Sequence, residues 1–199
     1  MKIFNVSLHR SATKSVHAFC KGVGGLKSLH WLGTEWESEY KDLSREQVAE
    51  KFINSKSDFD VCSDIPVPSI YDILDNEYPD SKFLLILRDP GDWIKSIKKH
   101  IGTRSLNPLE ALQYSFLCDK NISSLCQLSD KELRNVYGLH THKIKKYFSD
   151  TPGKLAVVNL KSESFSEDVK NFLEIESNEK IPNIDTHLAT GRPWRLGQL

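Results

Sequence analysis

The chain has 199 residues, of which 39% are hydrophobic, and its 27 basic residues balance 27 acidic residues. This length and apolar content suit one globular domain with a real core, which we assign to residues 1–199. A net charge near zero excludes a general attraction to nucleic acid or to anionic membranes, so we expect neither as a partner and any anion site must be local.

Strands alternate with helices in the first part of the chain. Residues 2–7 alternate in polarity, which predicts a strand, and apolar residues recur at helical spacing over 14–23. The further elements that we expect up to residue 77 are a strand over 28–32, a helix from the Ser44 capping box to about 54, a strand over 59–63 and a helix over 69–77.

The clearest strand is 82–87 (KFLLIL), a continuous apolar run that is typical of strands buried on both faces of a parallel sheet. A helix follows Arg88-Asp89-Pro90, and Asn107-Pro108 predicts the start of a helix that runs to about 127. The last elements that we expect are a helix from Ser129 or Asp130, a strand over 154–159 and a helix over 164–174.

This order of elements predicts an α/β fold: a three-layer α/β/α domain with a mostly parallel central sheet, similar to P-loop nucleotide-binding domains, plus a helical segment around 105–150. In such sheets ligands bind beyond the carboxyl ends of the strands. We therefore expect the functional residues within 8–15, 62–66 and 88–96.

Residues 8–15 (LHRSATKS) join the first strand to the first helix, in the layout of a phosphate-binding loop. A helix N-terminus offers free N–H groups and a positive dipole end, and Arg10 and Lys14 add charge. The glycines of GxxxxGK[ST] would fall at Leu8 and Thr13, which disfavours a standard ATP or GTP loop. By itself the segment also fits an ordinary capped helix with exposed basic residues.

Two further polar elements follow strands. Arg88 stands at the end of strand 82–87, where its planar fork can grip a phosphate, and Ser96 adds a hydroxyl eight residues later. Asp64 ends another strand, where a carboxylate can accept a proton from a hydroxyl. Taken singly, each residue also has a purely structural explanation. Arg88 fits an Arg–Asp surface pair, Ser96 fits a solvent-exposed serine on a helix, and Asp64 fits an aspartate that forms a turn.

Together these segments resemble the sulfotransferases that use 3′-phosphoadenosine 5′-phosphosulfate (PAPS). The family's first motif is a strand, a basic residue, a Ser/Thr-Gly-Thr turn and a helix, which residues 10–15 match with Ala12 in place of the glycine. The second is Arg-Asp-Pro followed by a Ser eight residues after the Arg, which Arg88 and Ser96 match. Two longer similar stretches extend the resemblance over most of the chain: YPDSKFLLILRDPGDWIKSI (78–97) and LAVVNLKSESFSEDVKNFLEI (155–175).

The resemblance implies that the protein transfers a sulfuryl group from PAPS, without a metal, to a hydroxyl or amine of a small-molecule acceptor, releasing 3′-phosphoadenosine 5′-phosphate (PAP). It implies that Arg10 stabilises the transferring group. It further implies a set of donor-binding residues: Arg10, Ser11, Ala12, Thr13, Lys14, Ser15, Arg88 and Ser96, with Arg192 in a C-terminal loop.

The candidate base is Asp64, because Asp64-Ile65-Pro66 occupies the place where the family's cytosolic branch has a His-Leu-Pro that supplies the general base. Aspartate has a reference pKa of about 3.9, so Asp64 needs burial to raise its basicity, or else it only orients the acceptor. The alternative bases are His9, His17, His30 and His100. His140 lies on the apolar stripe of a helix and is expected in the core.

Two hypotheses remain beside the sulfotransferase: a nucleotide-binding or interaction protein with a decayed site, and a small-molecule or nucleotide kinase. If Ala12 needs a positive φ, its methyl group costs about 1 kcal/mol, which fits the first alternative. The acceptor and the oligomeric state are not predicted. Five aromatic residues suit either an apolar acceptor pocket or, more simply, the core: Trp31, Trp36, Tyr40, Tyr114 and Phe116.

The remaining features favour a cytoplasmic protein. No stretch reaches the roughly 18 apolar residues of a membrane span, and the N-terminus has no secretory signal. The four cysteines form no CxxC pair and lie in apolar surroundings, so we expect buried thiols in a reducing compartment: Cys20, Cys62, Cys118 and Cys126.

Overall fold

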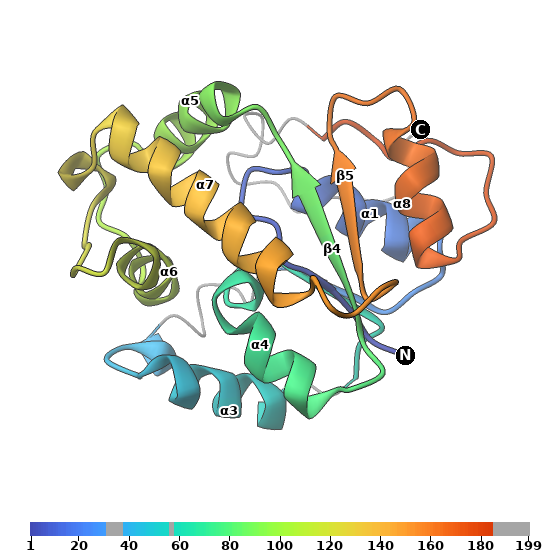
Figure 1. The fold of residues 1–199 in the computed structure, drawn as a ribbon, viewed down its shortest axis with the longest axis horizontal. Coiled ribbons are helices and arrows are strands. Elements are labelled where there is room, and N and C mark those ends of the chain that lie inside the picture. Colours follow the sequence, from blue (N-terminus) through green and yellow to red (C-terminus); the bar gives the residue numbers. More distant parts are fainter. Residues whose placement is uncertain (31–37, 56–57, 185–199) are drawn as a thin grey trace.

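A computed structural model of the protein describes residues 1–30, 38–55 and 58–184 (Figure 1). Within these residues, parallel strands form one five-stranded sheet in the order β2-β3-β1-β4-β5. The strands are β1 (Ile3–Asn5), β2 (Ser28–His30), β3 (Val61–Ser63), β4 (Lys82–Leu87) and β5 (Leu155–Asn159). The described sheet is therefore parallel throughout, because each of its four strand pairs is parallel.

Helices cover both faces of the sheet (Figure 1). The helices are α1 (Thr13–Gly22), α3 (Arg45–Ser55), α4 (Val67–Glu77), α5 (Pro90–Ile101), α6 (Pro108–Cys118), α7 (Asp130–Tyr147) and α8 (Phe165–Leu173). Helices α1 and α8 pack on one face, α3, α4 and α7 on the other, and α5 follows the carboxyl end of β4. This is the predicted three-layer architecture, with α6 and α7 as the predicted helical segment.

The apolar run of β4 is explained by its two buried faces. Phe83 and Leu85 pack against the layer that holds α4 and α7, whereas Leu84 and Ile86 pack against α1 and α8. All four side chains are at most 2% exposed. Because a fully buried apolar side chain contributes about 1.5–3 kcal/mol, this strand is a major part of the core.

One helix boundary differs from the prediction. The helix expected from Pro108 to about 127 ends at Cys118, where Asp119 takes a left-handed conformation with φ 52°. Aspartate tolerates this conformation well, and the Ser115 hydroxyl then accepts the Ile122 amide at 2.9 Å. A short 3₁₀ helix, Leu125–Gln127, follows in place of the last helical turns.

The cysteines are only partly as expected. Cys20 and Cys62 are buried, and burial raises the pKa of the Cys20 thiol to about 12. Cys126 is exposed, which contradicts the prediction, because it lies on the 3₁₀ helix that replaces the end of the expected long helix. None of the helices in the described part of the chain is long and apolar enough to cross a membrane.

Candidate functional site

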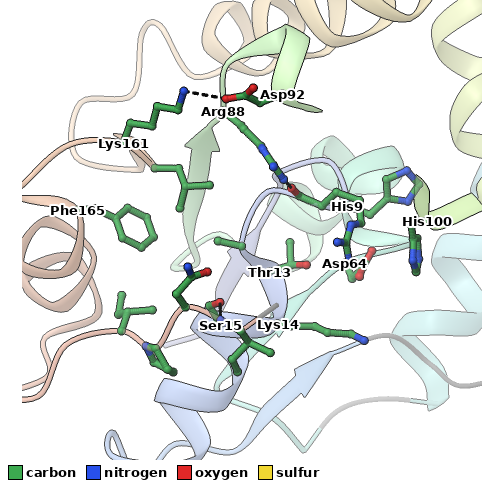
Figure 2. A pocket seen from close by; sticks show the side chains of 17 residues that line it. His9, Thr13, Lys14, Ser15, Asp64, Arg88, Asp92, His100, Lys161 and Phe165 are labelled. Atoms are coloured by element: carbon green, nitrogen blue, oxygen red, sulfur yellow. Dashed lines mark hydrogen bonds and ion pairs between the residues drawn. The ribbon is translucent and has the colours of Figure 1, made fainter. Parts of the chain in front are cut away.

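A cavity of about 460 Å³, here called the first cavity, lies at the carboxyl edge of the sheet (Figure 2). β1 lies between β3 and β4, so the loops that follow these three strands meet there, as at the strand-order switch points where α/β sheets bind ligands. The residues that line the cavity are His9, Arg10, Ala12, Thr13, Lys14, Ser15, Asp64, Arg88, Asp92, His100, Leu160, Lys161, Phe165 and residues 181–184.

The loop between β1 and α1 has an unusual backbone. Arg10 and Ala12, on either side of Ser11, have φ values of 67° and 60° and are left-handed. Turns that mix left- and right-handed residues gather backbone N–H groups into a concavity that binds anions. The alanine that replaces the expected glycine thus adopts the conformation that a glycine would favour, directly before the first residue of α1.

Helix α5 and the end of β4 hold this loop in place. The Trp93 indole donates to the His9 carbonyl at 3.0 Å, and the Arg88 guanidinium donates to the Arg10 carbonyl at 2.6 Å. The Arg10 Nε donates in turn to the Ser96 hydroxyl at 3.1 Å. The two sequence motifs are therefore one physical unit, in which the second motif shapes the first.

The first cavity is positively charged although the whole protein is neutral. Its described lining includes four cationic side chains and two carboxylates: Arg10, Lys14, Arg88 and Lys161 against Asp64 and Asp92. Lys161 lies 2.7 Å from the Asp92 carboxylate, as the dashed line in Figure 2 shows. The excess of positive charge favours a ligand with several negative charges.

The other end of the first cavity is apolar. Phe165 lies on the side away from Asp64 and His100 (Figure 2). It is joined there by other apolar lining residues: Leu160, Ile181, Pro182 and Ile184. The Ser15 hydroxyl accepts the Ile184 amide at 3.2 Å, so it anchors the segment after α8 beside the N-terminus of α1.

Asp64 has two partners. Its carboxylate accepts the Ile65 amide at 2.9 Å and lies 3.2 Å from His30 Nε2, which is also 3.2 Å from the Thr13 hydroxyl. Burial by itself raises the pKa of Asp64, but the hydrogen bonds that its carboxylate accepts from His30 and from the Ile65 amide outweigh the effect of burial. They hold the pKa of this carboxyl well below its usual range. Asp64 is thus a weaker base than an exposed aspartate, contrary to the increase in basicity that we considered from burial.

Two of the alternative bases line the cavity as neutral side chains. His9 is 4% exposed and lies 2.7 Å from the Tyr114 hydroxyl, and burial lowers its pKa. Burial, together with the Arg10 charge, lowers the pKa of His100 to about 4. His17 is bonded to Ser28 at 2.9 Å and is not part of the described lining.

A second cavity of about 520 Å³ adjoins the first. The two share four lining residues: His9, Lys14, Asp64 and His100. The described residues that line only the second cavity are His30, Ile65, Arg104, Ser105, Leu106, Asn107 and Glu110. A ligand in each cavity would therefore meet the other beside Asp64.

Two of the predicted site residues, Ser11 and Ser96, are not part of the described lining of the first cavity. Ser96 is bonded to Arg10, and the Ser11 hydroxyl is buried without a hydrogen-bond partner among the described residues. Arg192 lies outside the described residues, as do Trp31 and Trp36. For these residues the donor-binding and pocket-lining roles stay predictions.

Several lining residues are not among those predicted from the sequence. Lys161 and Phe165 follow β5, so extending the strand-end rule to that strand would have found them. Arg104 and Glu110 carry no such signal, because they come from the loop before α6 and from its first turn. Tyr40 and Tyr114 are buried in the core, the simpler of the two roles considered for them.

Comparison with known proteins adds one finding. A family model described as a sulfotransferase domain matches residues 2–187. No curated protein that was compared with the chain matches it. Over the described ranges, no group of three or more His, Cys, Asp or Glu side chains is placed to hold a metal ion.

Proposed function

The chain belongs to the sulfotransferase domain family, and from this premise we propose that it transfers a sulfuryl group from PAPS to a small-molecule acceptor. The observation that carries the proposal is the first cavity. It combines a left-handed turn at a helix N-terminus, an excess of cationic side chains and an apolar end. These are the features that a nucleotide with several anionic groups requires.

The chemistry of the lining fits such a donor from end to end. The apolar side chains around Phe165 suit an adenine ring, and the loop 10–15 with Lys14 suits a 5′-phosphosulfate. Arg88 is the candidate for the 3′-phosphate, since its fork has donors beyond the one given to the Arg10 carbonyl. When bound, PAPS supplies an activated sulfuryl group.

Arg10 and its neighbours stabilise charge during transfer. In our proposal the Arg10 guanidinium and the loop amides bind the negative charge that develops on the departing phosphate. Ser96, which accepts from Arg10 Nε, holds that guanidinium in position. The Ser15 hydroxyl, which accepts the Ile184 amide, holds the segment that ends at Ile184 in position beside the cavity.

Asp64 is the candidate for the proton acceptor, because it lies where the two cavities adjoin. Its lowered pKa keeps the carboxylate ionised at neutral pH but makes it a weak base. A weak base suffices if the transition state is loose, as in phosphoryl transfer. In such a transition state the acceptor hydroxyl loses its proton late, because it becomes acidic only as its oxygen bonds to sulfur. His30 positions the carboxylate.

The donor assignment is tested by titrating PAP and adenosine 5′-phosphate into the wild-type protein and the Arg88→Ala variant by calorimetry. We expect the variant to lose about 10- to 100-fold in PAP affinity, because a hydrogen bond to a charged group contributes about 1.5–3 kcal/mol. Adenosine 5′-phosphate, which lacks the 3′-phosphate, should lose only the smaller share that arises because Arg88 also holds the Arg10 carbonyl of the loop.

Arg134→Ala, on the exposed side of α7, is the control for a lost arginine. Equal losses for both nucleotides would sink the assignment of Arg88 to the 3′-phosphate. Tighter binding of ATP with magnesium than of PAP would favour a kinase instead. Intact PAP binding without transfer to any acceptor would favour a decayed site.

The role of Asp64 is tested by Asp64→Asn, which keeps the size of the side chain and tolerates its φ of 74°. We expect kcat to fall about 10²- to 10⁴-fold, the usual contribution of a positioned base, with little change in PAP affinity. Full turnover by this variant would transfer the role to His9 or His100, and His9→Gln and His100→Gln would then tell them apart.

A further inference from the structure

Asp92 has no role in the proposed transfer, although its carboxylate lies in a cavity that we propose for an anion. It lines the first cavity together with Arg88 and Lys161. A carboxylate in such a place repels a phosphate, unless a neighbouring cation compensates for its charge. The inference below rests on the proposed function, and it concerns what Asp92 and Lys161 do when the donor binds.

The sheet fixes the backbone of Lys161 beside that of Arg88. β4 and β5 pair in parallel with Leu87 opposite Asn159, so the residues that follow the two strands are neighbours at the carboxyl edge. The Leu160 amide donates to the Leu87 carbonyl at 2.8 Å, and the Lys161 amide donates to the Asn159 side chain at 2.9 Å. The main chain of Lys161 is therefore anchored independently of its side chain.

The Lys161 side chain can exchange its partner. It is 67% exposed, and its ammonium group lies 2.7 Å from the Asp92 carboxylate, which joins the loop after β5 to the first turn of α5 (Figure 2). An exposed ion pair of this kind contributes little to stability, because water screens it and a long side chain loses entropy in forming it. A stronger anion nearby can therefore replace Asp92 at low cost.

Arg88 is electrostatically coupled to this ion pair. The hydrogen bond and charge of Lys161 lower the pKa of Asp92, and the charge of Arg88 adds to this effect. The pKa of Lys161 is raised chiefly by its hydrogen bond to Asp92, and the charge of Arg88 opposes the increase. A phosphate held by Arg88 would therefore lie within electrostatic range of both members of the pair.

We propose that Lys161 is a second side chain that binds the donor's 3′-phosphate, and that Asp92 holds it at the rim of the first cavity until the donor arrives. A phosphate carries up to two negative charges and a carboxylate only one, so the phosphate attracts the ammonium group more strongly. Asp92 tolerates the loss of its partner, because it lies in the first turn of α5, where the helix dipole favours negative charge.

This exchange adds to the specificity for the donor. A nucleotide without a 3′-phosphate cannot replace the Asp92 carboxylate, so it gains nothing from Lys161. A nucleotide with that group gains a second cation beside Arg88. The pair of side chains thus favours PAPS and PAP over other adenine nucleotides.

The lysine is tested by calorimetric titration of PAP and adenosine 5′-phosphate into wild-type protein, Lys161→Met and Lys95→Met. We expect Lys161→Met to lose about 3- to 10-fold in PAP affinity and little in affinity for adenosine 5′-phosphate. Lys95→Met is the matched control, because Lys95 is exposed on the same helix as Asp92 but is not part of the described lining. It should bind PAP nearly as the wild type does.

Two results of this titration would overturn the inference. One is the same PAP affinity in Lys161→Met and Lys95→Met. The other is an equal loss for PAP and adenosine 5′-phosphate in Lys161→Met, which would place the lysine at the 5′-phosphate instead.

The restraint by Asp92 is tested by Asp92→Asn, which keeps the size of the side chain. We expect PAP affinity to rise about 3-fold or more, because the substitution releases Lys161 and removes a charge that repels phosphate. In the Lys161→Met background the gain should be smaller, since no lysine remains to be released, and the double-mutant cycle measures the difference. Weaker PAP binding by Asp92→Asn, or equal gains in both backgrounds, would refute the restraint.

The proposed function and this inference fail in different ways. A failure of the wild-type protein to bind PAP would contradict the proposed function. PAP binding by the wild type that neither Lys161→Met nor Asp92→Asn alters would contradict the inference alone.

Discussion

Ala12 adopts a left-handed backbone, with φ 60° and ψ 19°, where a glycine would carry no steric penalty. The left-handed conformation costs a residue with a Cβ roughly 1–2 kcal/mol. The protein keeps the turn nevertheless, because Trp93 and Arg88 bind the carbonyls of the two residues before Ser11. The methyl group therefore costs stability without abolishing the anion-binding geometry.

This leads to a prediction about Ala12→Gly. Because the substitution removes the steric strain, we expect the free energy of unfolding to rise by about 1 kcal/mol, less the entropy that glycine adds to the unfolded chain. Urea denaturation of the two proteins measures the difference. Ala111→Gly, inside α6, is the matched control and should lower the free energy of unfolding by about 1 kcal/mol. A loss of stability in both variants would show that Ala12 is not strained.

The ionisation of Asp64 also belongs to the residue scale. Its type and its place after a strand are readable from the sequence, but its partner His30 is not. The parallel pairing of β2 with β3 brings His30 opposite Ser63, the residue before Asp64. A carboxyl whose pKa depends on a histidine 34 positions away cannot be assessed from local sequence, and for that reason the pKa considered from burial had the wrong sign.

At the scale of elements, α7 binds the start of the functional loop through a buried histidine. His140 is 3% exposed, and its Nε2 lies 2.7 Å from the Val6 carbonyl. Burial lowers its pKa to about 4, so the ring is neutral and donates to this carbonyl at neutral pH. The prediction of His140 as a core residue is confirmed.

We expect a pH dependence of stability from this contact. The folded-state pKa is lowered from 6.5 to about 4, so the unfolded chain binds the proton first as the pH falls. The stabilising contribution is complete above pH 6.5 and is lost between about pH 6.5 and 4, on the order of 3 kcal/mol at most.

The comparison of wild-type protein with His140→Gln by urea denaturation at pH 7, 5.5 and 4.5 measures this contribution. The variant should lose stability less steeply on acidification, because glutamine keeps a donor for the Val6 carbonyl but does not titrate in this range. His142→Gln, exposed on the same helix, should follow the wild-type curve. Parallel curves for wild type and His140→Gln would refute the assignment.

The elements themselves were largely predictable, because their signals are local. Apolar periodicity and helix caps identified each described strand and α-helix, and the bounds of β4 are those predicted. The end of α6 was not predictable from the sequence. The helix ends there because Asp119 adopts a left-handed conformation and because the Ser115 hydroxyl accepts the Ile122 amide. Such a stop needs no glycine or proline and therefore leaves little trace in the sequence.

At the scale of the whole molecule, the 27 basic and 27 acidic residues balance, but their charges are unevenly distributed along the carboxyl edge of the sheet. The strand ends bring four cationic side chains to one cavity, while the adjoining cavity has balanced charge. The net charge of the chain argues against a general affinity for polyanions, but it cannot report how charges are distributed after folding.

The sequence alone determined the alternation of strands and helices, and with it the rule that residues after strands form the site. It also identified Arg10, Lys14, Asp64 and Arg88, since each follows a strand in a recognisable motif. Only the tertiary structure decided that β1 lies between β3 and β4, which brings these residues around one cavity. It alone also revealed the second cavity, because Arg104 and Glu110 reach the site through packing of helices whose relative placement no local pattern encodes.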